Sequence, residues 1–380
     1  MQYRDFTKDA VKTSLLGFGC MRFPCIDNDN SKINYTLSAK LLQYAIDKGI
    51  NYIDTAYNYH QENSEKFVGQ FLEENNLRKD IYLATKNPVW KAENHEDFER
   101  LLDEQLDRLK SDYIDFYLLH ALDKKRWDKI KSLDVFKFVE KAKSEKKIKY
   151  IGFSFHDKYE YFEEILNAYD WDFCQIQLNF MDENYQAGLK GLKLAAKKGI
   201  SVVIMEPLKG GKLAKLPDDI LSVFKNINPE YSSAENAMRY LMNMPEVSVV
   251  LSGMNDFYQI DENIKTACET LPNSLTEAEL NSFKEVEGLM NQRTKVDCTA
   301  CEYCMPCPFN VNIPGIFRLY NNKYIYGDLD SEKNYENLVK SEKDQSQCVE
   351  CGHCETQCPQ HLEIIEDLKA AHNDLYGRKI

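Results

Sequence analysis

The chain has 380 residues, of which 43% are hydrophobic, enough for a substantial core and for two or three domains. Its formal net charge of −13 argues against partners that need a basic face, such as nucleic acids and anionic membranes. Neither a run of about 18 apolar residues nor the apolar core of a signal peptide occurs. We therefore expect a cytoplasmic protein whose cysteines are metal ligands rather than disulfides.

Short β-rich runs alternate with amphipathic segments over roughly the first 270 residues. A helix over 97–110, for example, would place Phe98, Leu101 and Leu102 on one face. The runs are mostly apolar throughout, as expected of strands buried on both faces, and they lie at 14–21, 51–57, 81–86, 113–120, 149–156, 173–180, 201–208 and 247–254. Eight strands, each followed by a helix, predict a (β/α)8 TIM barrel over residues 1–274 and then a connecting helix over 275–293.

Polar side chains stand at the ends of three consecutive predicted strands. Asp54 ends the second strand with Tyr59 just beyond it, while Lys86 ends the third and His120 the fourth. Singly, each has an ordinary structural explanation, but a barrel aims its strand ends at one mouth. There a lysine would favour the phenolate of a tyrosine, a carboxylate would hold the lysine, and a histidine would orient a substrate oxygen. This combination predicts protonation of a carbonyl oxygen while a hydride reaches the carbon.

Two cysteine motifs occupy the C-terminal part of the chain. The first motif is Cys298, Cys301, Cys304 and Cys307, and the second is Cys348, Cys351, Cys354 and Cys358. The second has the C-x2-C-x2-C-x3-C-P spacing of bacterial ferredoxins, and the first has one residue fewer before its last cysteine. Zinc, the alternative, is usually held by well-separated C-x2-C pairs, so the motifs favour iron–sulfur clusters.

The ferredoxin spacing also predicts how the ligands are shared. In that run the fourth cysteine binds the other cluster. We therefore expect two [4Fe–4S] clusters, one held by the first three cysteines of the first motif with Cys358 and the other by those of the second motif with Cys307. The shorter spacing leaves an alternative open, in which the first motif binds its cluster alone.

Three short motifs carry a family resemblance. DTAYNY (54–59), ATK (84–86) and YLLH (117–120) resemble the catalytic motifs of the aldo-keto reductases, and the resemblance extends over about 270 residues. It implies Tyr59 as general acid/base, supported by Asp54, Lys86 and His120, in the NAD(P)H-dependent reduction of an aldehyde or ketone. It also implies a nicotinamide cofactor extended across the barrel mouth, and no Rossmann G-x-G-x-x-G follows an early strand.

The same resemblance implies a set of cofactor contacts. Ser154 and Gln175 match residues that contact the nicotinamide carboxamide, and Met205 stands where many members carry a stacking aromatic ring. Gly253 and Gln259 stand where many NADPH-dependent members carry Lys and Arg, so NADH and NADPH both remain open. The full set is Ser154, Gln175, Met205, Pro207, Leu208, Gly210, Gly253, Gln259, Glu262 and Asn263.

Residues 294–380 resemble two-cluster ferredoxins, especially the mainly α-helical kind whose cysteine motifs are joined by a long helical insert. A subset of aldo-keto reductases carries such a C-terminal domain, and the resemblance to it covers the full chain. It implies a small carbonyl substrate for the barrel and a ferredoxin or flavoprotein as a possible electron partner.

Two other functions remain open at this point. In one, the chain is an iron–sulfur electron-transfer protein whose barrel docks a redox partner, although the intact set around Tyr59 favours an enzyme. In the other, a flavin sits in the barrel mouth, because nicotinamide gives up two electrons as a hydride whereas a [4Fe–4S] cluster normally carries one at a time. The sequence shows no flavin motif.

Overall fold

The computed structural model describes residues 1–6, 9–328 and 330–377. The chain divides into two compact units, which we call the barrel unit and the cysteine unit. The barrel unit comprises Met1–Pro207 and Ala237–Leu275. The cysteine unit comprises Leu208–Asn236 and Thr276–Ile380. The loop that follows Pro207 is therefore part of the same compact unit as the C-terminal part of the chain.

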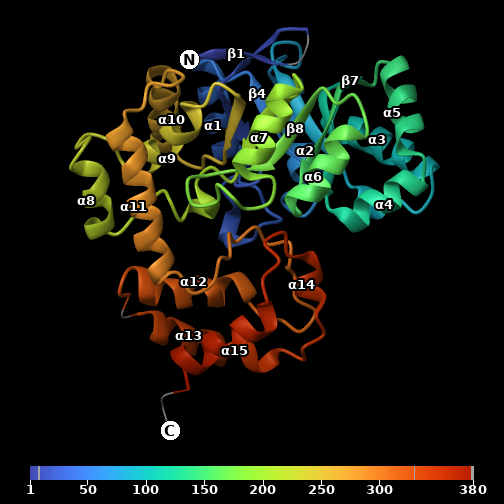
Figure 1. Ribbon diagram of the computed structural model, residues 1–380. Coiled ribbons are helices and arrows are strands. Elements are labelled where there is room, and N and C mark those ends of the chain that lie inside the picture. Colours follow the sequence, from blue (N-terminus) through green and yellow to red (C-terminus); the bar gives the residue numbers. More distant parts are fainter. Residues whose placement is uncertain (7–8, 329, 378–380) are drawn as a thin grey trace. The chain divides into compact units, whose positions relative to one another are not determined.

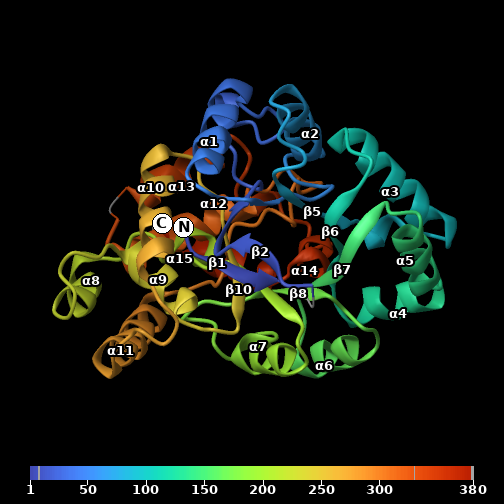
Figure 2. The ribbon, with the colours of Figure 1, turned by 90° about the horizontal axis from the view of Figure 1, so that it is seen from above.

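Eight parallel strands of the barrel unit close into a barrel in the order β10-β3-β4-β5-β6-β7-β8-β9, which confirms the predicted fold (Figure 2). Each strand overlaps one of the eight predicted apolar runs. The strands are β3 (Leu16–Gly19), β4 (Tyr52–Asp54), β5 (Tyr82–Asn87), β6 (Ile114–Leu122), β7 (Ile148–Phe155), β8 (Phe173–Gln177), β9 (Ser201–Met205) and β10 (Val247–Ser252).

Helices surround the strands (Figure 2). In α3 the predicted stripe of Phe98, Leu101 and Leu102 is fully buried. A side chain at Gly69 of α2 would collide with the carbonyl of Arg108, so this glycine allows α2 and α3 to pack closely. The helices are α1 (Tyr35–Asp47), α2 (Ser64–Glu74), α3 (Glu96–Leu109), α4 (Lys124–Ser132), α5 (Val135–Ser144), α6 (Tyr159–Asn167), α7 (Gly188–Lys197), most of α9 (Ser233–Met242), and α10 (Phe257–Glu269).

A two-stranded antiparallel sheet precedes the barrel, and the sequence did not predict it. Its strands are β1 (Tyr3–Phe6) and β2 (Val11–Ser14). Phe6 is fully buried and its ring lies 4.5 Å from that of Phe116, in a cluster with Tyr52 and Phe173. Since these partners lie near the beginnings of β4, β6 and β8, Phe6 fills the barrel at the end opposite the predicted site.

The cysteine unit is mainly helical, as predicted. Its helices α8 and α11 lie side by side (Figure 1), with the rings of Phe224 and Phe283 5.1 Å apart. A separate apolar core includes Ile316, Phe317 and Leu368, and cysteines of both motifs pack against it. The helices are α8 (Asp218–Lys225), α11 (Glu277–Arg293), α12 (Ile313–Ile325), α13 (Ser331–Lys340), α14 (His353–Gln357) and α15 (Ile364–Leu375).

Short 3-10 turns complete the described secondary structure. They are η1 (Ile26–Asn28), η2 (Val89–Lys91), η3 (Lys209–Gly211) and η4 (Gln345–Gln347). Among the helices in the described ranges, none is both long enough and apolar enough to cross a membrane.

Candidate active site and cysteine cavities

Lys86 is the centre of the polar group at the strand ends. Its side chain is almost completely buried, and its Nζ donates to Asp54 Oδ1 at 2.6 Å and to the Thr55 carbonyl at 2.7 Å. The same Nζ lies 3.3 Å from the hydroxyl of Tyr59. The structure therefore brings together the three side chains that the sequence placed on two different strand ends.

His120 completes the predicted set of four. The register of β6 and β7 shifts between Leu119 and Leu122, and Ala121 has a positive φ of 52°. This irregularity follows His120 directly, and the His120 and Tyr59 rings lie 6.3 Å apart at an angle of 80°. Tyr59 is partly exposed whereas His120 is buried, so the phenol is the more accessible of the two.

Burial sets the charge state of the group. It raises the pKa of Asp54 above its ordinary value, while the Lys86 ammonium opposes that rise and favours the carboxylate. Burial, helped by Lys86 and Arg126, lowers the pKa of His120 well below its ordinary value. His120 is therefore a neutral imidazole near pH 7, able to donate one hydrogen bond without adding a second positive charge beside Lys86.

Two side chains beside His120 were not identified from the sequence. The Trp90 ring, in the turn after β5, lies 5.1 Å from the His120 ring. The Arg126 guanidinium lies over Trp90 at 5.5 Å and donates to the carbonyl of Ala121 at 2.7 Å. Trp90 thus supplies an apolar surface next to the polar group, a role that a tryptophan in a loop does not reveal by sequence alone.

Ser154 and Gln175 are neighbours in the sheet, because they pair in register on β7 and β8. Ser154 Oγ accepts from the Ala121 amide at 2.7 Å, which leaves its own hydroxyl proton to donate. Gln175 Nε2 lies 3.5 Å from the sulfur of Met205, and no hydrogen-bond partner of its buried Oε1 is found among the described residues. A buried acceptor without a donor fits the amide group of a nicotinamide carboxamide.

The predicted pyrophosphate segment is divided between the two units. Met205 and Pro207 end the first stretch of the barrel unit, whereas Leu208 and Gly210 begin the first stretch of the cysteine unit. Gly210 has a φ of 66°, and a Cβ there would lie 2.1 Å from the carbonyl oxygen of Thr299. The close contact with Thr299 therefore explains why residue 210 is a glycine, whether or not a nucleotide binds there.

The residues predicted at the adenosine end lie at the end of β10 and along α10. Gln259 Oε1 accepts from the Asn255 amide at 2.9 Å, and Glu262 accepts from the Tyr258 hydroxyl at 2.7 Å. Asn263 is buried and donates to Ser252 Oγ at 3.1 Å. These bonds order the first turns of α10, and contact with a nucleotide stays a prediction.

Arg22, which no sequence motif indicates, lies against Gly253. A Cβ at Gly253 would lie 3.1 to 3.6 Å from the Cβ, Cγ and Cδ atoms of Arg22. The barrel closes by pairing β3 with β10, which brings these distant residues together. Arg22, in the loop after β3, therefore places a positively charged side chain beside Gly253, which has no charge of its own.

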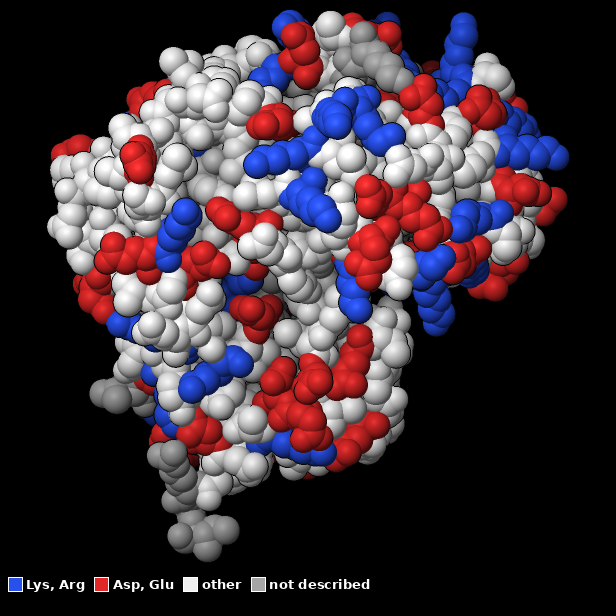
Figure 3. Space-filling view, in the orientation of Figure 1, with Lys and Arg blue, Asp and Glu red and all other residues white. Residues whose placement is uncertain are grey.

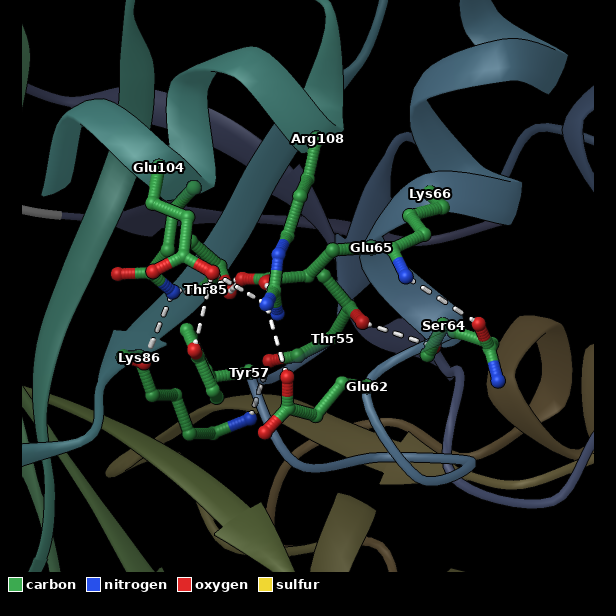
Figure 4. Close-up of polar contacts among 12 residues, drawn as sticks. Thr55, Tyr57, Glu62, Ser64, Glu65, Lys66, Thr85, Lys86, Glu104 and Arg108 are labelled. Carbon is green, nitrogen blue, oxygen red and sulfur yellow. Dashed lines mark hydrogen bonds and ion pairs between the residues drawn. The ribbon is translucent and has the colours of Figure 1, made fainter. Parts of the chain in front are cut away.

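A second buried charge network lies directly behind Lys86 (Figure 4). Glu65 Oε1 accepts from Thr85 Oγ1 and from Gln105 Nε2, each at 2.6 Å. Gln105 Nε2 also lies 3.0 Å from the Lys86 carbonyl oxygen, and Arg108 lies 3.5 Å from the second oxygen of Glu65. The network thus holds the backbone that carries Lys86.

The cysteines line two cavities of the cysteine unit. The first cavity is lined by Cys298, Cys301, Cys304 and Cys358, together with apolar residues of α12 and α15. The second is lined by Cys307, Cys348, Cys351 and Cys354, and Cys304 reaches its edge as well. The first cavity measures about 320 Å³ and the second about 370 Å³, and both are partly open to solvent. Each is lined by the four cysteines that crossed ligation assigns to it.

The surroundings of the cavities suit iron–sulfur clusters. The Ala300 amide lies 3.4 Å from Cys298 Sγ, the kind of N–H···S contact that stabilises a thiolate ligand. No disulfide links any of the twelve cysteines, all of which lie in the described ranges. In the described part of the chain, no three His, Cys, Asp or Glu side chains converge closely enough to hold one metal ion.

Comparisons with known proteins identify both parts of the chain. The aldo/keto reductase family model matches residues 15–287, and a 4Fe-4S dicluster domain matches residues 297–363. The uncharacterized oxidoreductase YqkF of Bacillus subtilis is 28% identical over 315 residues, which are 75% of this chain and 96% of that protein. L-galactose dehydrogenase of Arabidopsis thaliana is 25% identical over 292 residues, 71% of this chain and 89% of that protein.

Solved structures resemble the barrel. The aldo-keto reductase AKR11C1 of Bacillus halodurans, in its holo form, superposes with a TM-score of 0.62 at 26% identity, over 75% of this chain and 96% of that one. An aldo-keto reductase of Klebsiella pneumoniae in complex with NADPH superposes with a TM-score of 0.61 at 20% identity, over 76% and 96%, and this likeness shows the fold alone.

The network behind Lys86 predicts a pH dependence of stability. Burial raises the pKa of Glu65 from 4.5 to about 7, against the opposing effect of its hydrogen bonds and Arg108. The folded protein therefore binds this proton more tightly than the unfolded chain, and the stability it contributes is lost as the pH rises from about 4.5 through 7. Relative to the wild type, Glu65→Gln should gain about 3 kcal/mol in the free energy of unfolding between about pH 4 and pH 8.

Glu62→Gln provides the matched control. Glu62 binds the same Arg108 at 2.8 Å, but it is half-exposed and its neighbouring cations keep its pKa below the ordinary value. Urea denaturation across this pH range should leave the Glu62 variant parallel to the wild type above about pH 5. A constant difference between Glu65→Gln and the wild type would contradict the assignment.

Proposed function

The chain belongs to the aldo/keto reductase family and carries a 4Fe-4S dicluster domain, and on that basis we propose that it reduces an aldehyde or ketone with NAD(P)H. It is an oxidoreductase. The observation that carries the proposal is the position of the Lys86 ammonium, which is buried against the Asp54 carboxylate and lies 3.3 Å from the Tyr59 hydroxyl.

Proton transfer is assigned to Tyr59. The phenol is partly exposed, so a carbonyl oxygen can reach it, and the buried Lys86 ammonium stabilises the negative charge that remains when the proton leaves. Asp54 keeps that ammonium charged and fixed. Neutral His120 donates a hydrogen bond that orients the carbonyl oxygen toward Tyr59, and the Trp90 ring beside it holds the apolar part of the substrate.

The nucleotide assignment rests on the two neighbouring residues at the ends of β7 and β8. A bound nicotinamide supplies the hydride that reaches the carbonyl carbon. Gln175 Oε1 would accept a hydrogen bond from the nicotinamide carboxamide, and the Ser154 hydroxyl would donate one to the same group. Two relatives have NADP(+) in their names, and Arg22 beside Gly253 provides a cation for a phosphate, so the proposal covers NADPH as well as NADH.

The proton donor is tested by Tyr59→Phe. The variant keeps the ring but lacks the acidic hydroxyl, so carbonyl reduction should fall by a factor of at least about 100 while nucleotide affinity stays within about twofold. Steady-state kinetics with the best aldehyde from a screen and fluorescence titration of the nucleotide measure the two quantities. Tyr57→Phe is the matched control, because this hydroxyl bonds to Glu104 and not to Lys86. Retention of most of the wild-type rate in Tyr59→Phe would refute the assignment.

We assign the cluster ligands as crossed between the two cysteine motifs. Cys298, Cys301 and Cys304 hold the first cluster with Cys358, and Cys348, Cys351 and Cys354 hold the second with Cys307. The support is that the same two sets of cysteines line the two cavities. Since Cys307 and Cys358 each come from the other motif, the clusters also fasten the two ends of the domain together.

Cys358→Ala tests crossed ligation. Anaerobically prepared wild-type protein should hold about eight irons per chain, and the variant should lose the signal of the first cluster in electron paramagnetic resonance while the second persists. Cys268→Ala is the control, because Cys268 is exposed in the barrel unit. An unchanged first cluster in Cys358→Ala would mean that the first motif binds its cluster alone.

Electron transfer to a protein partner is the second candidate function. Residues 344–368 include six acidic residues and neither Lys nor Arg, and Figure 3 shows acidic side chains gathered over the region of α14 and α15. Cys351 is exposed in the same region. A ferredoxin or flavoprotein with a basic face is the partner that this charge would attract.

The spectrum of the anaerobic protein separates the two functions. If the barrel reduces carbonyls directly, the supernatant after acid precipitation should lack flavin absorbance, and NADPH alone should leave the cluster absorbance unchanged. Flavin bands in the supernatant, or bleaching of the clusters by NADPH, would instead favour the electron-transfer function.

A further inference from the structure

A short loop of the cysteine unit packs on the backbone that leads into the first cysteine motif. This loop, residues 209–212, follows strand β9 in the chain and is called here the lysine loop. At its centre Gly210 meets Thr299 so closely that a Cβ would lie 2.1 Å from the Thr299 carbonyl oxygen and 2.9 Å from its Cα. Thr299 is itself buried and lies between two cysteines of the first motif. The contact is thus tight, and it exists because residue 210 is glycine.

The two lysines on either side of Gly210 turn toward the same backbone. Lys212 Nζ donates to the Val296 carbonyl at 3.2 Å and lies 3.4 Å from Asp297 Oδ1. Lys209 Nζ lies 3.7 Å from the same oxygen. Lysine side chains are rarely buried, yet Lys209 is only 4% exposed. Two ammonium groups and one carboxylate therefore leave a net charge of about +1 beside this backbone.

This charge lies next to the first cavity. Cys298 and Thr299, which follow Asp297 directly, line that cavity, and Lys212 lies within electrostatic reach of the Cys298 thiol. Neither lysine is among the expected nucleotide contacts, although Leu208 and Gly210 beside them are. The reduction potential of an iron–sulfur cluster depends on the charges and hydrogen bonds around it and on its exposure.

We propose that the lysine loop sets the reduction potential of the first cluster, with Lys209 and Lys212 raising it and Asp297 partly offsetting them. One-electron reduction adds one negative charge to the cluster, and fixed ammonium groups nearby stabilise the added charge. No bond forms or breaks and no proton moves in this step, and the electron comes from whichever reductant poises the solution. The proposal rests on the assignment of Cys298 to the first cluster.

The test is a redox titration of the first cluster, followed by electron paramagnetic resonance without nucleotide or carbonyl substrate. In Lys212→Gln and Lys209→Gln the ratio of reduced to oxidised cluster at a given potential should fall about tenfold, which is about 59 mV for one electron. Asp297→Asn should change the ratio by a similar factor in the opposite direction. Lys225→Gln, an exposed lysine at the end of α8 in the same unit, should leave it unchanged.

Iron content and a charge-conserving variant keep the outcome decisive. Lys212→Arg retains the positive charge and should stay within about threefold of the wild type. If Lys212→Gln fails to hold iron, Lys209→Gln and Asp297→Asn still test the effect of charge. Equal potentials in the wild type, Lys212→Gln and Asp297→Asn would overturn the proposal, as would shifts of the same sign in the last two. Because no carbonyl reduction is measured, failure of the reductase proposal would leave this result intact.

Discussion

The ion pair between Lys86 and Asp54 is the constraint on which the candidate active site depends. Two charges with side-chain exposures of 1% and 3% are costly to remove from water, and their mutual attraction and hydrogen bonds must offset that cost. Asp54 contributes one oxygen to the pair, and no hydrogen-bond partner of its buried Oδ2 is found among the described residues. The Thr55 carbonyl and the Tyr59 hydroxyl complete the coordination of the ammonium. Loss of either partner would leave an uncompensated buried charge, at a cost of about 3–5 kcal/mol. The loop between β4 and α2 is therefore tied to β5 at the point where Tyr59 lies.

Glu65 of α2, a second ionisable group, packs against the other side of the same strand end. Glu65 accepts hydrogen bonds from Thr85 and from Gln105, which also contacts the Lys86 carbonyl. Thr85 and Lys86 are adjacent in the chain, so one side chain faces this network while the next faces Asp54. The geometry of the ammonium is thus fixed from both faces of β5, which is what a site needs if Tyr59 is to transfer a proton at a defined position.

The cysteine unit depends on the close packing of Gly210 against Thr299. Leu208–Asn236 belongs to this unit although it follows a barrel strand, so the chain enters the cysteine unit twice. The first entry supplies the lysine loop and α8, and the second supplies α11 and both cysteine motifs. A loop that the family resemblance relates to the nucleotide pyrophosphate is in this chain also a wall beside the first cysteine motif.

The strands, the set around Lys86 and the cysteine motifs were predictable because each leaves a local pattern. Buried strands read as apolar runs, strand ends point to one mouth, and cluster ligands have fixed spacings. The sheet β1–β2 was not predicted, because its strands alternate polar and charged residues with few apolar ones and only Phe6 enters the core. Arg22 against Gly253 and Gly210 against Thr299 arise from contacts between distant segments, which no local pattern encodes.

A structure of the protein with oxidised nucleotide and a bound aldehyde or carboxylate analogue tests the central claim most directly. The account predicts that the ligand oxygen lies within about 2.6–3.2 Å of the Tyr59 hydroxyl, with Lys86 still bonded to Asp54. The nicotinamide carboxamide should then donate to Gln175 Oε1. A ligand oxygen bound away from Tyr59, or a nucleotide whose carboxamide does not reach Gln175, would contradict the assignment of this group as the active site.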